Sequence, residues 1–111
     1  MTAPRLHFRL GPDQRPIAET DAPGYQGLAT FLTTEANWPE YIGLLLDHAA
    51  AAARTHQASV STGNAFQVTF TNEDVTISHL HRADWPAVTV PADAFATEAR
   101  AWLAWLLTHP A

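Results

Sequence analysis

The chain has 111 residues and a formal net charge of −5, with eleven carboxylates against six arginines. It contains no lysine and no cysteine, which excludes lysine-dependent phosphate loops, covalent lysine catalysis, disulfides and thiolate metal sites. The acidic balance argues against nucleic acid and anionic membranes as partners and favours a basic protein. An apolar fraction of 47% at this length predicts one globular domain over residues 1–111.

The N-terminal region predicts a β-hairpin and no targeting segment. It holds no apolar run long enough for a signal peptide or a membrane-spanning helix. A chain without cysteine also suits a reducing compartment, so we expect a cytoplasmic protein. Leu6, Phe8 and Leu10 alternate with polar residues, which predicts a half-buried strand. Turn residues then lead into a short returning strand, and a short helix is expected over residues 25–33.

The clearest helix of the sequence covers residues 37–56. Pro39 suits the first helical position, and Glu40 favours the positive end of the helix dipole. In a helical projection, most of the leucine, isoleucine and alanine side chains gather on one face, whereas Glu40 and Asp47 lie on the opposite face. Leu44 falls on that polar side, so we expect an apolar residue among acidic ones there.

The second half predicts three strands and a final helix. Alternating apolar residues at 66–70 and 75–81, with a short strand at 87–90, indicate an antiparallel meander linked by turns. Pro91 opens the last helix, whose apolar arc spans about 200°, well above the width of about 100° that a surface helix needs. Trp105 lies on one side of this arc. A second helix or a second copy of the chain must therefore cover part of it.

Together these elements predict an α+β domain. We expect an antiparallel sheet of about five strands, made of the N-terminal hairpin and the C-terminal three-strand meander, with two main helices packed on one face. The segment at 57–65 breaks the long helix and reads as a loop, because it is rich in serine, glycine and asparagine.

His79 and His81 are the one place where the sequence suggests metal chemistry. Residues two apart on a strand share a face and lie about 6.6 Å apart along it, so two imidazoles can converge on one ion. A catalytic zinc needs a third protein ligand. The candidates for that ligand are Asp84, His7, His48 and His56. We favour the alternative interpretation, a strand end whose imidazoles bond to water or to carbonyl groups, with no metal and no other cofactor.

No catalytic motif accompanies these histidines. No serine lies in a recognised nucleophile motif. Glu73 and Asp74 fall at a predicted hairpin tip, where water solvates both carboxylates, whereas acid–base pairs usually require burial. Trp85 follows in a loop, where it either anchors an interface or covers the end of the sheet. We therefore expect a protein without enzymatic activity.

The second half also resembles a known class of proteins. The stretches "GNAFQVTFTNEDVTISHL" and "AVTVPADAFATEARAWLAWL" are similar to small bacterial immunity proteins, in which a short meander runs into a proline-started helix with an aromatic-rich face. The resemblance covers residues 63–107 and implies a toxin as partner. It implies no site residue, because most matching positions are residues that build the fold. These positions are Gly63, Asn64, Val68, Val75, Ile77, Val88, Pro91, Phe95, Trp102 and Leu106.

These observations favour a protein-interaction module, one form of which is an immunity-type protein that neutralises a toxin. Two alternatives stay open. One is a small metal-binding protein or metalloenzyme built on His79 and His81, and the other is a homo-oligomeric structural protein, dimeric through its C-terminal helix. The candidate partner-binding residues are acidic or large apolar residues outside the predicted core. They are Glu35, Glu40, Leu44, Asp47, Glu73, Asp74 and Trp85.

Overall fold

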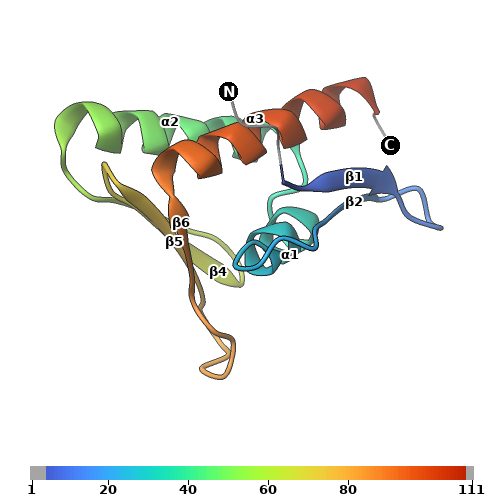
Figure 1. Ribbon diagram of the computed structural model, residues 1–111, viewed down its shortest axis with the longest axis horizontal. Helices are drawn as coiled ribbons and strands as arrows, with labels where there is room; N and C mark the ends of the chain where they lie inside the picture. Colours follow the sequence, from blue (N-terminus) through green and yellow to red (C-terminus); the bar gives the residue numbers. More distant parts are fainter. Residues whose placement is uncertain (1–4, 110–111) are drawn as a thin grey trace.

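A computed structural model describes residues 5–109, which form an α+β structure with three helices and two antiparallel sheets. In chain order the elements are β1 (His7–Leu10), β2 (Pro16–Glu19), α1 (Gln26–Thr34), α2 (Pro39–Thr55), β3 (Ser59–Thr62), β4 (Phe66–Phe70), β5 (Asp74–His79), β6 (Val88–Pro91) and α3 (Ala92–Thr108). Figure 1 shows α2 and α3 above the larger sheet, and the β1–β2 hairpin under the far end of α3. The predicted α+β class is confirmed.

The strands form two sheets rather than the single five-stranded sheet that the sequence predicted. β1 pairs with β2, and the second sheet has the order β3-β4-β5-β6 with every pair antiparallel. At β2, a side chain of α1 takes the place of a neighbouring strand. Thr33 Oγ1 accepts a hydrogen bond from the Ala18 N–H (2.9 Å) and donates one to the Ala18 carbonyl (3.1 Å).

β3 lies in the segment that the sequence predicted to be a loop. Its alternation is inverted, because Ser61 is buried whereas Val60 is 50% exposed. Sequence patterns predict strands from large apolar residues at every second position, and β3 turns none of these toward the core. Its pairing with β4, which joins Ser59 to Phe70 and Ser61 to Val68, makes it a strand.

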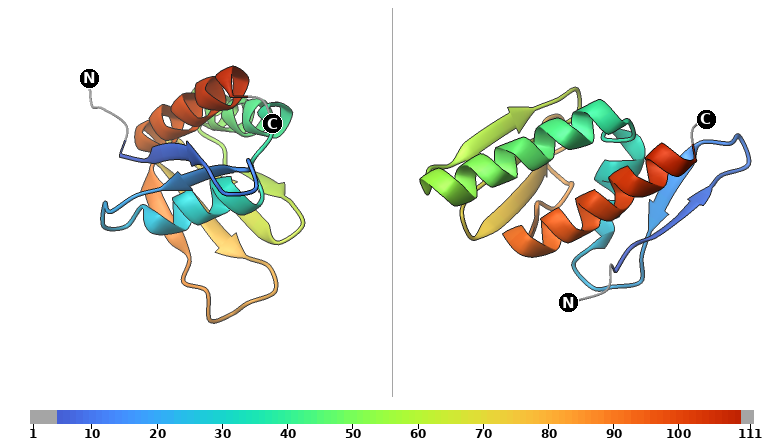
Figure 2. Two further views of the ribbon diagram at one scale, coloured as in Figure 1. Left: turned by 90° about the vertical axis from the view of Figure 1, so that its right-hand side faces the viewer. Right: turned by 90° about the horizontal axis from the view of Figure 1, so that it is seen from above.

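The core lies between the larger sheet and the two long helices, and it extends to Leu28, Phe31 and Leu32 of α1. Phe66, Val68 and Phe70 of β4 are buried, as their alternation predicted. The ring of Phe70 packs edge-on against Phe95 of α3, with ring centroids 5.7 Å apart. Figure 2 shows α2 and α3 side by side and running in opposite directions over the same face of this sheet. The other face of the sheet carries mostly threonine, serine and glutamine side chains.

The wide apolar arc of α3 is covered within the chain. Trp102 is fully buried, its Nε1 donates to the Ala36 carbonyl at 2.8 Å, and its ring lies 5.2 Å from that of Phe8 in β1. Trp105 stacks beside Trp102 and also lies 6.2 Å from Phe8. On the other side α2 packs against α3, and Leu107 stays 63% exposed. The sequence predicted that a second helix or a second copy of the chain covers part of this arc. In the structure the β1–β2 hairpin and α2 cover it.

Glu98 is a buried carboxylate that fastens the start of the hairpin to α3. Its Oε1 and Oε2 accept the Arg5 N–H at 3.0 and 2.9 Å, and Oε1 also accepts the Leu6 N–H at 3.1 Å. Charge-assisted bonds from two backbone amides offset part of the cost of burying the charge. No local sequence pattern marks Glu98, because its partners lie 92 and 93 positions away along the chain.

Replacing Glu98 with alanine should destabilise the fold by about 2–4 kcal/mol, because two backbone N–H groups lose their acceptor and a buried space opens. Glu98→Gln keeps one oxygen and should cost less. Urea unfolding measures both. Glu40→Ala, on the exposed side of α2, is the matched control and should stay within about 0.5 kcal/mol of the natural chain. An equal, small effect of both alanine variants would contradict the role given to Glu98.

Candidate partner-binding groove

A groove of about 420 Å³ lies between the C-terminal half of α2 and the N-terminal half of α3. Half of its lining residues are alanines. The lining residues are Leu46, Ala49, Ala50, Ala53, Asn72, Ala92, Asp93, Ala96, Thr97 and Arg100. Small side chains let the backbone of a third element come close to both helices, since the distance between packed helices depends on the side chains at the contact.

Carboxylates gather at the end of this groove where α3 begins. Asp93 is part of the lining, and its Oδ1 accepts the Ala94 N–H at 2.8 Å. The Ala92 N–H donates to the Glu73 carbonyl at 2.8 Å, which holds the β4–β5 turn against the first turn of α3. Glu73 of that turn and Asp74, the first residue of β5, are exposed. This end of the groove is therefore acidic, whereas Arg100 supplies a positive charge further along α3.

The structure divides the predicted partner-binding residues among separate places. Glu40, Leu44 and Asp47 are exposed on α2 and do not line the groove, and Leu44 is 49% exposed. Glu73 lies in the turn that bonds to the start of α3, and Asp74 begins β5 opposite Pro91, so both are near the acidic end of the groove but outside its lining. The exposed leucine between acids on α2 was predicted correctly from the helical projection.

Trp85 lies in the β5–β6 connection, apart from the α2/α3 groove and from the exposed side of α2. Its ring is half-buried and packs edge-on against Phe66, with ring centroids 5.2 Å apart. It also lies 6.3 Å from the ring of His79. This position fits the interpretation of Trp85 as a cover over the end of the sheet.

His79 and His81 are occupied by hydrogen bonds to the backbone. The N–H groups of His81 and Arg82 donate to Nδ1 of His79 at 3.1 and 3.0 Å, so this nitrogen carries no proton. His81 Nε2 lies 3.1 Å from the Asn64 carbonyl, which accepts its proton. The two rings are 6.1 Å apart. His79 therefore shapes the turn after β5, and His81 ties this turn to the β3–β4 connection.

The residues proposed as a third metal ligand beside His79 and His81 either bond to other side chains or lie in other parts of the fold. Arg82 Nη2 donates to Asp84 at 3.1 Å, and this hydrogen bond, with the guanidinium charge, lowers the pKa of Asp84. His7 is in β1 of the other sheet, and His48 Nδ1 lies 2.6 Å from Ser59 Oγ. His56 ends α2 in a left-handed conformation. Over residues 5–109, no three histidine, aspartate or glutamate side chains are placed to hold a metal ion.

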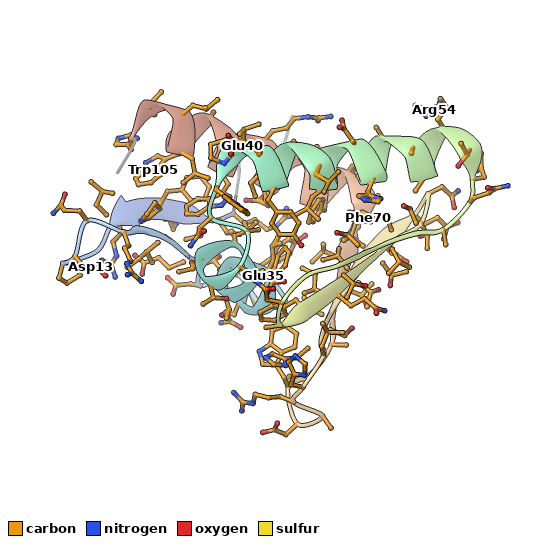
Figure 3. The ribbon with its side chains drawn as sticks, turned by 180° about the vertical axis from the view of Figure 1, so that it is seen from behind. Asp13, Glu35, Glu40, Arg54, Phe70 and Trp105 are labelled. Atoms are coloured by element: carbon orange, nitrogen blue, oxygen red, sulfur yellow. The ribbon has the colours of Figure 1, made fainter. Side chains whose placement is uncertain are left out.

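Glu35 serves the fold and is not a free surface charge. Its carboxylate accepts the Ala65 N–H at 2.7 Å and the Phe66 N–H at 3.2 Å, which anchors the start of β4 (Figure 3). A Cβ atom at Gly63 would lie 3.0 Å from Glu35 Cδ and 3.1 Å from Tyr41 Oη, so glycine is needed for this close approach. Sequence reasoning placed Glu35 at a contact surface, because no local pattern reveals an acceptor 30 positions from its donor.

A second groove of about 420 Å³ lies between α1 and β6. Gly27 of α1 approaches Val88 closely there, and Trp85 forms part of the wall. None of the residues that line this groove is ionisable. The α1/β6 groove can therefore contact a ligand only through packing and neutral hydrogen bonds, whereas the α2/α3 groove also contains charged side chains.

No protein-family model matches the sequence, and no similar curated protein or solved structure was found. None of the helices within residues 5–109 is long and apolar enough to cross a bilayer.

The phenol of Tyr41 should make the fold sensitive to alkali. Its buried oxygen has no hydrogen-bond partner among the described residues. Burial raises the pKa of Tyr41 above 10.0, the nearby Ser61 hydroxyl opposes this shift, and the Glu35 charge adds to it. The unfolded chain therefore loses the phenolic proton first. Stability from this group is complete below the ordinary tyrosine pKa and falls as the pH rises through it.

Tyr41→Phe should consequently reduce the loss of stability between about pH 9 and about pH 11. Urea unfolding at a series of pH values measures the slope. Tyr25→Phe leaves Tyr41 in place and serves as the matched control, which should keep the alkaline loss of the natural chain. Identical slopes for the natural chain and Tyr41→Phe would show that the phenol does not couple to folding.

Proposed function

We propose that the chain is a non-enzymatic cytoplasmic interaction module whose α2/α3 groove receives a basic amphipathic helix of a protein partner. The observation that carries this proposal is the combination of an apolar, alanine-rich floor with carboxylates at one end of the same groove. Neither feature alone defines a partner. Together they match a helix that has small or apolar residues on one side and arginine or lysine toward its end.

The physical support comes from packing and charge. A helix lying in the groove buries apolar surface at about 25 cal/mol per Å², and the alanines allow close contact with both walls. Asp93 in the lining, with Glu73 in the adjacent turn, then lies near the basic end of the incoming helix. The net charge of −5 also attracts a positive protein over longer distances and raises its rate of association.

A toxin is the kind of partner that we propose, because residues 63–107 resemble immunity proteins. The chemistry of the groove agrees with one class of toxin in particular. A toxin that acts on nucleic acid needs a positive surface of its own, and the acidic end of the groove complements such a surface. Binding there would cover the positive surface of the toxin.

The test begins with the proteins encoded beside this chain. A basic neighbour, purified and titrated onto the chain, should bind with an affinity that falls as salt rises. Ala50→Trp fills the groove and should weaken binding at least about tenfold. Ala104→Trp adds the same side chain at an exposed position of α3 outside the lining and should bind like the natural chain.

Charge provides the second arm of the test. Glu73→Gln combined with Asp93→Asn should weaken binding and flatten its salt dependence. A partner that binds Ala50→Trp as tightly as the natural chain would exclude the groove. The absence of any basic neighbour that binds would count against the immunity-type role.

A further inference from the structure

β3 is an edge strand with one unpaired side. It pairs with β4, and no other strand formed by residues 5–109 pairs with it. The Gly63 N–H donates to the Phe66 carbonyl at 2.9 Å. Because antiparallel bonds alternate along a strand, Ser61 and Ser59 also direct their backbone groups toward β4. The N–H and C=O groups of Val60 and Thr62 therefore point away from the sheet, at its open edge.

Apart from the short length of β3, which has four residues, this edge has none of the usual protections against pairing. Proteins shield edge strands with charged residues, proline, bulges or a covering element. Residues 55–72 contain no charged residue and no proline, and the β3–β4 register is regular. Val60 is β-branched and half exposed.

Each of the other edge strands carries a protection of this kind. The charged Arg9 lies in β1. Pro91 lies in β6, where α1 also approaches Val88, and Thr33 occupies the free side of Ala18 in β2. Compared with these edges, the free side of β3 is the one most open to pairing with another strand.

We propose that β3 pairs with β3 of a second copy of this chain, antiparallel and about a two-fold axis at Ser61. In this register Val60 lies opposite Thr62 of the partner copy, and Thr62 lies opposite the partner's Val60. Both pairs are of the hydrogen-bonded kind, so about four backbone bonds form across the seam. The result is one continuous sheet built from the four-stranded sheets of both copies. This contact is isologous, so it closes at the dimer.

The position of Leu44 supports a second copy of the chain as the partner of β3, because Leu44 lies beside the two-fold axis at Ser61. His48 of α2 contacts Ser59 at one end of β3, and Tyr41 of α2 approaches Gly63 just beyond the other end. Leu44 lies between these two helix positions, level with Ser61, on the flank that it shares with His48 one turn later. It is 49% exposed. The two-fold axis brings the two copies of Leu44 toward each other above the β3 seam.

The charge at the strand seam also suits a second copy. Two chains of net charge −5 repel each other over most of their surfaces. The segment at 55–72 carries no formal charge, so the paired strands bring no like charges together, whereas Glu40 and Asp47 flank Leu44 on α2 and oppose its approach to the second copy. This inference is independent of the proposed function, because the seam and the α2/α3 groove use different residues.

Sedimentation velocity of the full chain, from about 10 µM to about 500 µM, tests the dimer. We expect the mass to approach twice that of one chain as concentration rises. Val60→Lys and Leu44→Lys change exposed side chains at the seam, and each should weaken the dimer at least about tenfold. Circular dichroism confirms that each variant keeps the fold.

Leu107→Lys is the matched control, because Leu107 is also exposed but lies on the C-terminal helix. It should leave the dimer unchanged, as should the groove variant Ala50→Trp, so that failure of this proposal and failure of the proposed function are distinguishable. A monomer at every concentration would overturn the proposal. So would a dimer that persists in Val60→Lys and Leu44→Lys, or one that Leu107→Lys alone dissociates.

Discussion

The buried face of α3 is the constraint on which the rest of the structure depends. Within residues 5–109 the two sheets share no strand pairing, so their relative position rests on side chains. Phe95 packs against Phe70 of the larger sheet, while Glu98 and Trp102 hold the hairpin and the α1–α2 connection. Together with α1, whose Thr33 bonds to β2 and whose Phe31 packs against Phe66 of β4, this helix makes the two-stranded hairpin, marginal alone, and the larger sheet parts of a common core.

The same helix positions the surfaces that concern function. The buried face of α3 contacts both sheets, and its first half packs beside α2, where the groove lies. The β4–β5 turn reaches α3 through the bond between Ala92 and Glu73, which brings acidic residues to the groove. The β3 edge lies on the far side of α2, so groove and edge can be occupied together.

How much could be predicted from sequence depended on how local the signal is. The alternation at 66–70 and the proline-started helices reflect residues near in sequence, and these elements were predicted correctly. β3 was missed, because Ser61 faces inward and Val60 outward, which reverses the pattern that marks a strand. Glu98 and Glu35 look like surface carboxylates in sequence. Both accept backbone hydrogen bonds from distant segments, which only the tertiary fold brings together.

The features of the candidate site also divide into those with a local sequence signal and those that depend on tertiary contacts. Leu44 among acids on α2 came from a helical projection, which is a local argument, and its exposure was predicted. The groove depends on how α2 packs against α3, and its acidic end depends on the β4–β5 turn meeting α3. Neither contact leaves a trace in spacing or composition. The histidine pair shows the converse, since H-x-H spacing suggested metal chemistry while His79 and His81 bond to the backbone.

Native-state hydrogen exchange tests the central claim, that the α3 face makes both sheets one cooperative unit. The Leu6 amide, which donates to Glu98, reports on the hairpin, and the Val68 amide reports on the larger sheet. If α3 joins the two sheets in this way, both amides exchange only through global unfolding, with the same opening free energy and the same dependence on denaturant. Exchange of Leu6 through a separate opening of much lower free energy would contradict it.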